Sequence, residues 1–331
     1  MNEVKGIKIR NLSVYHPDNV RDNDYYVDFY GEKGNIARKI AEETLGRDKR
    51  FVIDPDSDET TITMAVKACK KVLKKEGLKG KDIDIICFCT FTSEYVMPPG
   101  ALIIHNEIGG KEKAICYDLN VNCIGMIYGL EQLSKYMSAA TGKKRALLVG
   151  ADYCSFIFNP KEIMNCVSVG DAACAVIIEK TDDLSKTIDT DYYIESHYCH
   201  HARAPMCGFS NMLKAKKEDL YYSFQPPETS IDKSAKKIKV MLQEHNLKVS
   251  DIKLFCTSQF SENMGKTLLS ELGASENQGL YVGDKYGYTG QSSPFLCLHE
   301  AIRRGMIKRG DYIVMWTLGA SAQYIMSLIH F

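Results

Sequence analysis

The stretch Asp118-Leu-Asn-Val-Asn-Cys123-Ile-Gly125 sets a cysteine between an expected strand and an expected helix. Upstream, residues 114–117 form a short apolar run of strand length. Downstream, apolar side chains recur at three- and four-residue spacing, which predicts a helix with one buried face. The residues with this spacing are Met126, Ile127, Leu130, Leu133 and Met137. We therefore expect the chain to turn from strand to helix at Cys123.

The expected position of Cys123 favours chemistry at its sulfur. Asn122 is a good N-cap residue, so Cys123 should lie in the first turn of the helix. Free backbone N–H groups and the positive end of the helix dipole meet there, and both favour a thiolate over a thiol. Such a thiol is a candidate nucleophile for acyl transfer. Cysteine is also a common small buried hydrophobe, and position and flanking residues alone leave both interpretations open.

The composition excludes several classes of protein. The chain has 331 residues, of which 45% are hydrophobic, and 42 basic side chains balance 42 acidic ones. This length permits two domains or one large domain with a substantial core. Zero net charge gives no electrostatic reason to expect nucleic acid as a partner. The chain shows neither a signal peptide nor an apolar run of membrane-spanning length, so we expect no membrane partner.

Cysteine usage indicates a reducing compartment. The 12 cysteines are scattered along the chain without the short spacings of a disulfide framework. Several of them lie inside apolar runs, among them Cys87, Cys89 and Cys174. Reduced thiols in a cytoplasmic protein fit this pattern best.

A cluster of histidines and cysteines raises the question of a metal site, because imidazole and thiolate are the usual ligands of zinc. The spacing of these residues fits none of the common structural zinc patterns, so we predict no bound metal. The cluster comprises His197, Cys199, His200, His201 and Cys207.

The chain repeats itself. Read 169 residues apart and without a gap, Ala65–Thr92 resembles Ser234–Ser261. Each copy predicts an amphipathic helix, a short Asp-Ile turn and an apolar strand, the strands being residues 82–89 and 251–256. The pattern indicates two similar α/β units with buried strands covered by helices on both faces. We expect the chemical partners of Cys123 in the matching turns of the second unit.

Two segments lack a clear period. Residues 18–34 are polar and rich in Tyr and Asp, which predicts a loop or irregular structure. Residues 198–228 contain three prolines and break both periodicities, so we expect a cap or an access loop there.

These motifs together resemble a known family. A cysteine in Asn-x-Asn-Cys-x-Gly, within a duplicated α/β chain of this length, resembles ketoacyl-acyl-carrier-protein synthase III, the thiolase-fold condensing enzyme that begins fatty acid synthesis. Residues 168–176 are similar to the family's Gly-Asp-Gly-Ala-Gly-Ala segment, residues 285–293 to its Gly-Asn-Thr-Ser turn, and residues 317–320 to its late Gly-rich loop. The likeness spans nearly the whole chain in the expected order.

The resemblance implies a fold. We expect a thiolase-like α/β protein with a duplicated five-layered αβαβα arrangement. Residues 1–182 would form the half that carries the nucleophilic cysteine. Residues 183–331 would form the half that supplies its partners.

The resemblance also implies an activity. Cys123 would take an acyl group from coenzyme A or an acyl-carrier protein. A malonyl thioester on carrier protein would then lose carbon dioxide, and the resulting enolate would attack the acyl-enzyme. The backbone N–H groups of Cys123 and Gly319 would hold the first oxyanion. The family works as a homodimer and needs no cofactor.

The sequence departs from the family pattern at two positions. The family's histidine in His-Gln-Ala-Asn is replaced by Ser258, and the asparagine of its Gly-Asn-Thr turn by Tyr288. Hydroxyl groups donate hydrogen bonds but are poor acid–base groups at neutral pH. Three functions therefore stay open: a condensing enzyme with Cys123, Ser258 and Tyr288, an acyltransferase that does not decarboxylate, and a catalytically silent subunit of a condensing-enzyme complex.

Two further features match functional positions of the family. Met97 lies where the dimer partner inserts an apolar side chain into the acyl pocket. Arg47, Lys49 and Arg50 form a basic turn near the stretch that contacts coenzyme A phosphates and carrier protein. The alternative for Met97 is simple packing before a proline-rich turn. The alternative for the basic turn is an exposed surface without a specific function.

Overall fold

The computed structural model describes residues 5–139, 142–225 and 231–331. A five-stranded sheet carries the first half of the chain, with the strand order β1-β7-β6-β4-β5. Its strands are β1 (Gly6–Tyr15), β7 (Ala172–Thr181), β6 (Arg145–Asp152), β4 (Ile85–Cys89) and β5 (Ile115–Leu119). Strand β4 pairs in parallel with β5 and β6, while β7 is antiparallel to β1 and β6.

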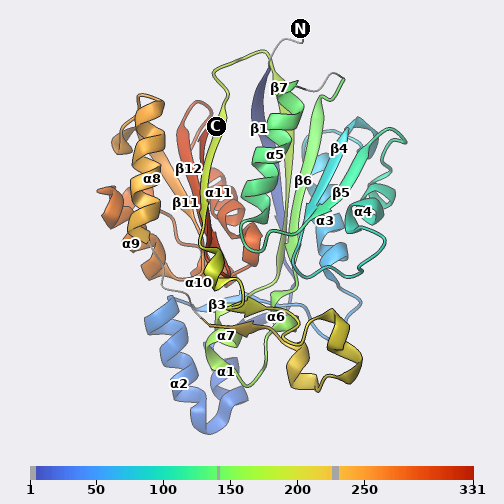
Figure 1. The fold of residues 1–331 in the computed structure, drawn as a ribbon, viewed down its shortest axis with the longest axis vertical. Coiled ribbons are helices and arrows are strands. Elements are labelled where there is room, and N and C mark those ends of the chain that lie inside the picture. Colours follow the sequence, from blue (N-terminus) through green and yellow to red (C-terminus); the bar gives the residue numbers. More distant parts are fainter. Residues whose placement is uncertain (1–4, 140–141, 226–230) are drawn as a thin grey trace.

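A four-stranded sheet carries the second half, with the order β11-β12-β13-β8. Its strands are β11 (Ile252–Thr257), β12 (Tyr312–Gly319), β13 (Gln323–His330) and β8 (Ile188–Ile194). Strands β11 and β12 are parallel, and the other two pairs are antiparallel. Figure 1 shows the two sheets side by side.

Helices cover both faces of each sheet and complete five layers (Figure 1). Helices α5 (Gly125–Ala139) and α11 (Ser293–Arg303) lie between the sheets. Helices α3 (Thr61–Lys75) and α4 (Gly100–Ile108) pack on the outer face of the first sheet, and α8 (Ile231–Glu244) and α9 (Glu262–Leu272) on that of the second. The predicted α/β αβαβα arrangement is confirmed.

The strands are apolar on both sides because both sides are buried. In β4, Ile85, Cys87 and Cys89 face the central layer, and Ile86 and Phe88 face α3 and α4. This alternation follows from the two-residue period of a strand. A strand with two buried faces is a continuous apolar run, as the sequence of β4 shows.

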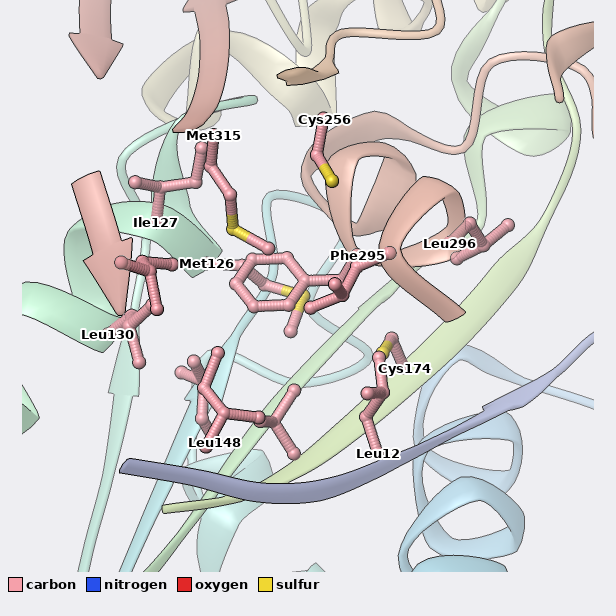
Figure 2. Packing of buried hydrophobic residues seen from close by; sticks show 14 of the residues in the cluster. Leu12, Met126, Ile127, Leu130, Leu148, Cys174, Cys256, Phe295, Leu296 and Met315 are labelled. Atoms are coloured by element: carbon pink, nitrogen blue, oxygen red, sulfur yellow. The ribbon is translucent and has the colours of Figure 1, made fainter. Parts of the chain in front are cut away.

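Figure 2 shows the central layer from close by. Met126 of α5 lies beside Phe295 of α11, and Leu130 and Leu296 of the same two helices belong to the same cluster. Each sheet contributes its inner face, and both Leu148 of the first sheet and Met315 of the second are fully buried. The two halves thus share one hydrophobic core.

The internal repeat predicted from the sequence appears in the structure. Helix α3, the 3₁₀ turn η3 (Gly80–Asp82) and β4 follow one another in the first half. Helix α8, the 3₁₀ turn η7 (Val249–Asp251) and β11 follow one another in the second. The expected strand at 82–89 is shorter than predicted, because Asp82 ends η3 and its carboxylate accepts a hydrogen bond from the Lys79 N–H at 2.8 Å.

The expectation of a loop at residues 18–34 is wrong. This region holds β2 (Val20–Asp22), α1 (Asn23–Tyr30) and η1 (Gly31–Lys33). Asp22 caps α1 by accepting a hydrogen bond from the Tyr25 N–H at 2.9 Å. The helix has a weak sequence signal because its apolar face is built from tyrosines, of which Tyr26 is buried. The chain continues through α2 (Gly34–Lys39), the π-helical η2 (Ile40–Leu45) and β3 (Lys49–Phe51).

Short elements surround the edge of the sheets where the site lies. In the first half they are α6 (Cys154–Ile157) and α7 (Ile163–Ser168). In the second half they are η8 (Glu276–Gln278), α10 (Gly283–Tyr286) and η9 (Gly290–Ser292). Residues 196–225, here named the cap segment, contain η4 (Ser196–Tyr198), β9 (Ala202–Arg203), η5 (Phe209–Lys214), η6 (Lys217–Leu220) and β10 (Ser223–Phe224). None of the helices that the structure describes is both long and apolar enough to cross a membrane.

Candidate active site

A cavity of about 220 Å³ lies where the strand ends of the two halves meet. Its wall is mostly apolar and aromatic, with a few polar groups. Both halves and the cap segment contribute to it, so the described part of the predicted cap does border the cavity, while residues 226–228 of that prediction lie outside the described residues. The lining includes Phe91, Asn120, Asn122, Cys123, Cys154, Phe158, Arg203, Tyr222, Phe224, Ser258, Phe260, Tyr288, Leu318, Gly319 and Ala320.

Cys123 lines this cavity, but it precedes the helix rather than lying in its first turn. Helix α5 begins at Gly125, and the Gly125 N–H donates to the Asn122 carbonyl at 3.1 Å. Asn122 has φ 50°, whereas an N-cap residue is extended, so the predicted N-cap role is wrong. Its side-chain amide instead donates to the Ala320 carbonyl at 3.4 Å, which joins the two halves beside Cys123.

The expectation of a stabilised thiolate at Cys123 is also wrong for this structure. Burial raises the pKa of Cys123 to about 11. Hydrogen bonds from the Tyr288 hydroxyl and the Ala320 N–H oppose this rise, and the negative charge of Asp152 adds to it. In the resting protein the sulfur is a neutral thiol, because desolvation outweighs the two donors.

Backbone hydrogen bonds and ring packing fix the position of Tyr288 in the cavity that contains Cys123. Its N–H donates to the Ser168 carbonyl at 2.8 Å, and its carbonyl accepts from the Gly170 N–H at 3.0 Å. Phe260 packs edge-on against its ring, with 5.4 Å between the centroids. Burial raises the pKa of Tyr288 well above its usual value, so the phenol stays protonated and serves as a hydrogen-bond donor.

Ser258 follows β11 directly and lines the same cavity. Its N–H donates to the Trp316 carbonyl at 2.8 Å, which fixes the residue against β12. The side chain is buried, and no hydrogen-bond partner for its hydroxyl oxygen is found in the described residues. Buried hydroxyls normally have a partner, so this one is free to bond a ligand in the cavity.

The late Gly-rich loop contributes a residue that sequence reasoning missed. Gly319 ends β12 and lines the cavity, as predicted, but the backbone N–H that reaches the Cys123 sulfur belongs to Ala320. Ser321 and Ala322 then turn into β13 with φ of 68° and 58°. Such a turn is rare for residues other than glycine. The only signal in the sequence was that Ala320 follows Gly319 in the motif.

Arg47 and Arg50 are not the exposed basic turn that was predicted. Both are 0% exposed. The Arg47 guanidinium donates to the carbonyls of Gln259 at 2.8 Å, Phe260 at 2.7 Å and Ser168 at 3.1 Å. Gln259 and Phe260 directly follow Ser258, and the Ser168 carbonyl also accepts from the Tyr288 N–H, so Arg47 positions both sides of the site from behind. Lys49 is exposed, and its contact with coenzyme A phosphates stays a prediction.

Arg50 plays a similar part beside it. Its guanidinium donates to the Asn23 side-chain oxygen at 2.9 Å and to the Val167 carbonyl. Burial lowers the pKa of Arg50 to about 10 and also lowers that of Arg47. The prediction was wrong for both residues because the local sequence of a basic turn does not show whether its guanidinium groups face water or buried carbonyls.

Asp152 is a second residue that sequence reasoning missed. It ends β6 and is fully buried beneath the cavity. Its carboxylate accepts hydrogen bonds from the Phe91 N–H at 2.9 Å, the Thr90 hydroxyl at 3.2 Å and the Gln291 amide at 3.1 Å. Burial raises the pKa of Asp152 to about 7. An acid at the end of an otherwise apolar run was the available signal.

The remaining candidates lie elsewhere. Met97 is 83% exposed and does not line the cavity of its own chain. Among the residues that the structure describes, no histidine lines the cavity. In the part of the chain that the structure describes, no group of three His, Cys, Asp or Glu side chains is arranged to hold a metal ion.

Comparison with known proteins identifies the family. The model for 3-oxoacyl-[acyl-carrier-protein] synthase III matches residues 117–195, and the model for the C-terminal part of the same family matches residues 242–331. The chain belongs to the 3-oxoacyl-[acyl-carrier-protein] synthase III family. The first match contains Cys123, and the second contains both Ser258 and Tyr288.

Relatives of synthase III type match along nearly the full length. The β-ketoacyl-[acyl-carrier-protein] synthase III of Aquifex aeolicus (strain VF5) is 26% identical over 317 residues, covering 95% of this chain and 96% of the relative. The synthase III of Clostridium perfringens is 26% identical over 331 residues, covering 98% and 99%. The solved 3-oxoacyl-[acyl-carrier-protein] synthase III from Aquifex aeolicus VF5 has the same fold, with a TM-score of 0.85 at 24% identity, over 98% of this chain and 100% of that one. The protein is therefore an enzyme of the acyltransferase class that this synthase family defines.

Proposed function

We propose that the protein is a 3-oxoacyl-acyl-carrier-protein synthase III-like acyltransferase of fatty acid or related acyl-chain biosynthesis. Cys123 takes an acyl group from an acyl-CoA or acyl-carrier-protein thioester and condenses it with a malonyl thioester. One observation carries the proposal. Cys123 of the first half lines a largely apolar cavity together with Ser258 and Tyr288 of the second, and hydrogen bonding from the Tyr288 hydroxyl and the Ala320 N–H lowers the pKa of Cys123 against the effect of burial.

The first step acylates Cys123. The sulfur attacks the thioester carbonyl, the bond to the coenzyme A or carrier sulfur breaks, and the proton of the Cys123 thiol leaves with the departing thiol. The two donors at the sulfur stabilise the charge that develops as the thiol ionises. Backbone N–H groups of Cys123 and Gly319 would hold the carbonyl oxygen as it becomes an oxyanion.

Acylation changes the hydrogen bonding in the cavity. A thioester sulfur is a weaker acceptor than a thiolate, so the Tyr288 hydroxyl becomes free to donate elsewhere. Ser258 offers a second hydroxyl that has no partner in the described structure. Together they can bind the thioester oxygen of a malonyl group.

The second step does not require a histidine base. The malonyl carbon–carboxylate bond breaks, its electrons form the enolate, and carbon dioxide leaves without any proton being abstracted. The enolate carbon then attacks the acyl-enzyme carbonyl and breaks its bond to the Cys123 sulfur, which leaves as a thiolate and takes a proton from water to restore the thiol. Two neutral hydrogen-bond donors at the enolate oxygen stabilise the negative charge that develops in this step. The hydroxyl groups of Ser258 and Tyr288 fit that role.

Two measurements test the proposal. Intact-mass analysis after incubation with acyl-CoA should show one acyl adduct on the wild-type protein and none on Cys123→Ala. Release of carbon dioxide from malonyl-carrier protein by the acylated enzyme then distinguishes condensation from acyl transfer without decarboxylation. Equal labelling of wild type and Cys123→Ala would refute the role of Cys123, and the absence of any adduct would indicate a silent subunit.

The proposal includes a homodimer. Strand β5 is an edge of the first sheet, and an exposed edge offers backbone groups for pairing with a second copy. The nearby loop is strongly exposed, with Val96 and Met97 each 83% accessible. Met97 would reach the acyl pocket of the partner subunit, and sedimentation velocity would test the association.

The proposal also covers the domain boundary, cofactors and location. We place the boundary of the halves between residues 182 and 183, because β7 of the first sheet ends at Thr181 and β8 of the second begins at Ile188. The reaction uses only side chains and backbone groups, so we propose no cofactor. All twelve cysteines are free, which is consistent with a cytoplasmic enzyme.

A further inference from the structure

Arg203 places a charged side chain in the wall of the active-site cavity. Among the described residues that form its wall, Arg203 alone carries a formal charge at neutral pH. Its neighbours in the wall include Phe158, Tyr222 and Phe224. The proposed transfer chemistry at Cys123 does not use this cation.

Arg203 sits on a well-anchored part of the cap segment. It lies in β9 opposite Ser223 of β10, in register. The Tyr222 N–H donates to the Ile157 carbonyl at 2.7 Å, and the Tyr222 ring packs edge-on against Phe158 with 4.9 Å between centroids. Figure 1 shows this segment, in dark yellow, beside α6. The backbone of Arg203 is therefore held as part of the cavity wall.

Arg203 is solvent-exposed where it lines the cavity, so its guanidinium is available to a ligand that enters there. Within the described parts of the chain it forms no ion pair and no side-chain hydrogen bond, in contrast to Arg47 and Arg50. The residues on either side of it, Ala202 and Ala204, also line the cavity and have small side chains that leave room beside it. A guanidinium with free donors binds a carboxylate through two parallel hydrogen bonds.

We propose that Arg203 selects acyl donors that carry a carboxylate at the far end of the acyl chain, that is, dicarboxylic acyl thioesters. The inference rests on the proposed function of Cys123 and names the substrate class of that site. The transfer step is unchanged, since the thioester is exchanged onto Cys123 and the distal carboxylate is not consumed.

The malonyl carboxylate is a poorer match for Arg203. That carboxylate must leave as neutral carbon dioxide, so an ion pair would stabilise the ground state more than the transition state. A distal carboxylate on the acyl donor keeps its charge throughout, and the ion pair then contributes to binding at every stage.

The test compares donors of matched length. Initial rates of Cys123 acylation are measured by intact mass with succinyl-, glutaryl- and adipoyl-CoA and with butyryl-, valeryl- and hexanoyl-CoA. The readout is the ratio of the acidic to the neutral donor at each length. We expect a ratio of about ten or more at the best length in the wild type, falling toward one in Arg203→Met and recovering in part in Arg203→Lys. Lys214→Met, which removes an exposed cation of the same cap segment, should keep the wild-type ratio.

Several outcomes would overturn the inference. A wild type without preference for acidic donors would do so. So would an equal loss for both donors in Arg203→Met, which would place Arg203 at the phosphates of coenzyme A. Repeating the series with N-acetylcysteamine thioesters, which lack phosphates, must reproduce the preference. A loss of carbon dioxide release alone would assign Arg203 to the malonyl carboxylate and refute the inference.

The same data separate this inference from the proposed function. Labelling of Cys123 by neutral donors without any preference would refute only the role of Arg203. The absence of labelling by every donor would refute the proposed function itself.

Discussion

The hydrogen bond between Tyr288 and the Cys123 sulfur makes a quantitative prediction. With a pKa of about 11, roughly one Cys123 in a thousand is ionised at pH 8. A hydrogen bond to a charged group contributes about 1.5–3 kcal/mol, and sulfur acceptors lie at the low end. Tyr288→Phe removes that bond and should raise the pKa of Cys123 by about one unit. The rate of thiolate chemistry at a fixed pH should then fall about tenfold.

The assay is alkylation of Cys123 by iodoacetamide between pH 7 and pH 10, followed by peptide mass spectrometry because other cysteines also react. Below the pKa, the wild-type rate should rise about tenfold per pH unit without a plateau. Tyr288→Phe should give a parallel line about tenfold lower. Tyr222→Phe is the matched control, because Tyr222 lines the same cavity and makes no hydrogen bond to Cys123. Its rate should stay within about twofold of the wild type.

Two results would refute this reasoning. A wild-type plateau near pH 7 would mean that the thiolate is stabilised after all and that burial does not control the pKa of Cys123. An unchanged rate in Tyr288→Phe would mean that the hydroxyl does not bond the sulfur in solution.

Three further substitutions probe the surroundings of the site. Ser258→Ala should leave acylation of Cys123 intact but slow carbon dioxide release by about 10²-fold, measured with labelled malonyl-carrier protein, and equal rates would remove Ser258 from the second step. Asp152→Asn deletes a negative charge that raises the pKa of Cys123, so alkylation at pH 8 to 9 should become faster, and a slower rate would contradict the assigned sign. Arg47→Met removes the guanidinium donor from the buried carbonyls of Gln259 and Phe260, while the Ser168 carbonyl keeps its bond from the Tyr288 N–H. The free energy of unfolding should fall by about 3 kcal/mol in urea titrations, and a loss below about 1 kcal/mol would show that water replaces the guanidinium.

Local patterns in the sequence were enough to predict the order of the elements. The apolar run of β4 and the period of α5 each depend on residues close together in the chain, and the internal repeat shows the same local pattern a second time in α8 and β11. The duplication then implied two sheets whose strand ends meet, and Cys123, Ser258 and Tyr288 do line one cavity. The tyrosine-rich helix α1 was missed because its buried face is not made of aliphatic residues.

The electrostatic properties of the site were decided by tertiary structure. The sequence nominated Cys123 as a helix-borne thiolate, Arg47 as a surface cation and Gly319 as the donor of the loop. In the folded protein Cys123 precedes the helix, Arg47 is enclosed, and Ala320 supplies the N–H at the sulfur.

The sequence by itself determined which elements form and which residue types stand at their ends, because strand and helix periods are set by near neighbours. Only the tertiary structure decided which charged side chains stay exposed to solvent and which backbone groups donate hydrogen bonds to the Cys123 sulfur. The physical reason is that desolvation and hydrogen-bond direction depend on segments far apart in the chain. Arg47 and Gln259 are 212 residues apart in the chain, yet the Arg47 guanidinium nitrogen Nη2 lies 2.8 Å from the Gln259 carbonyl oxygen.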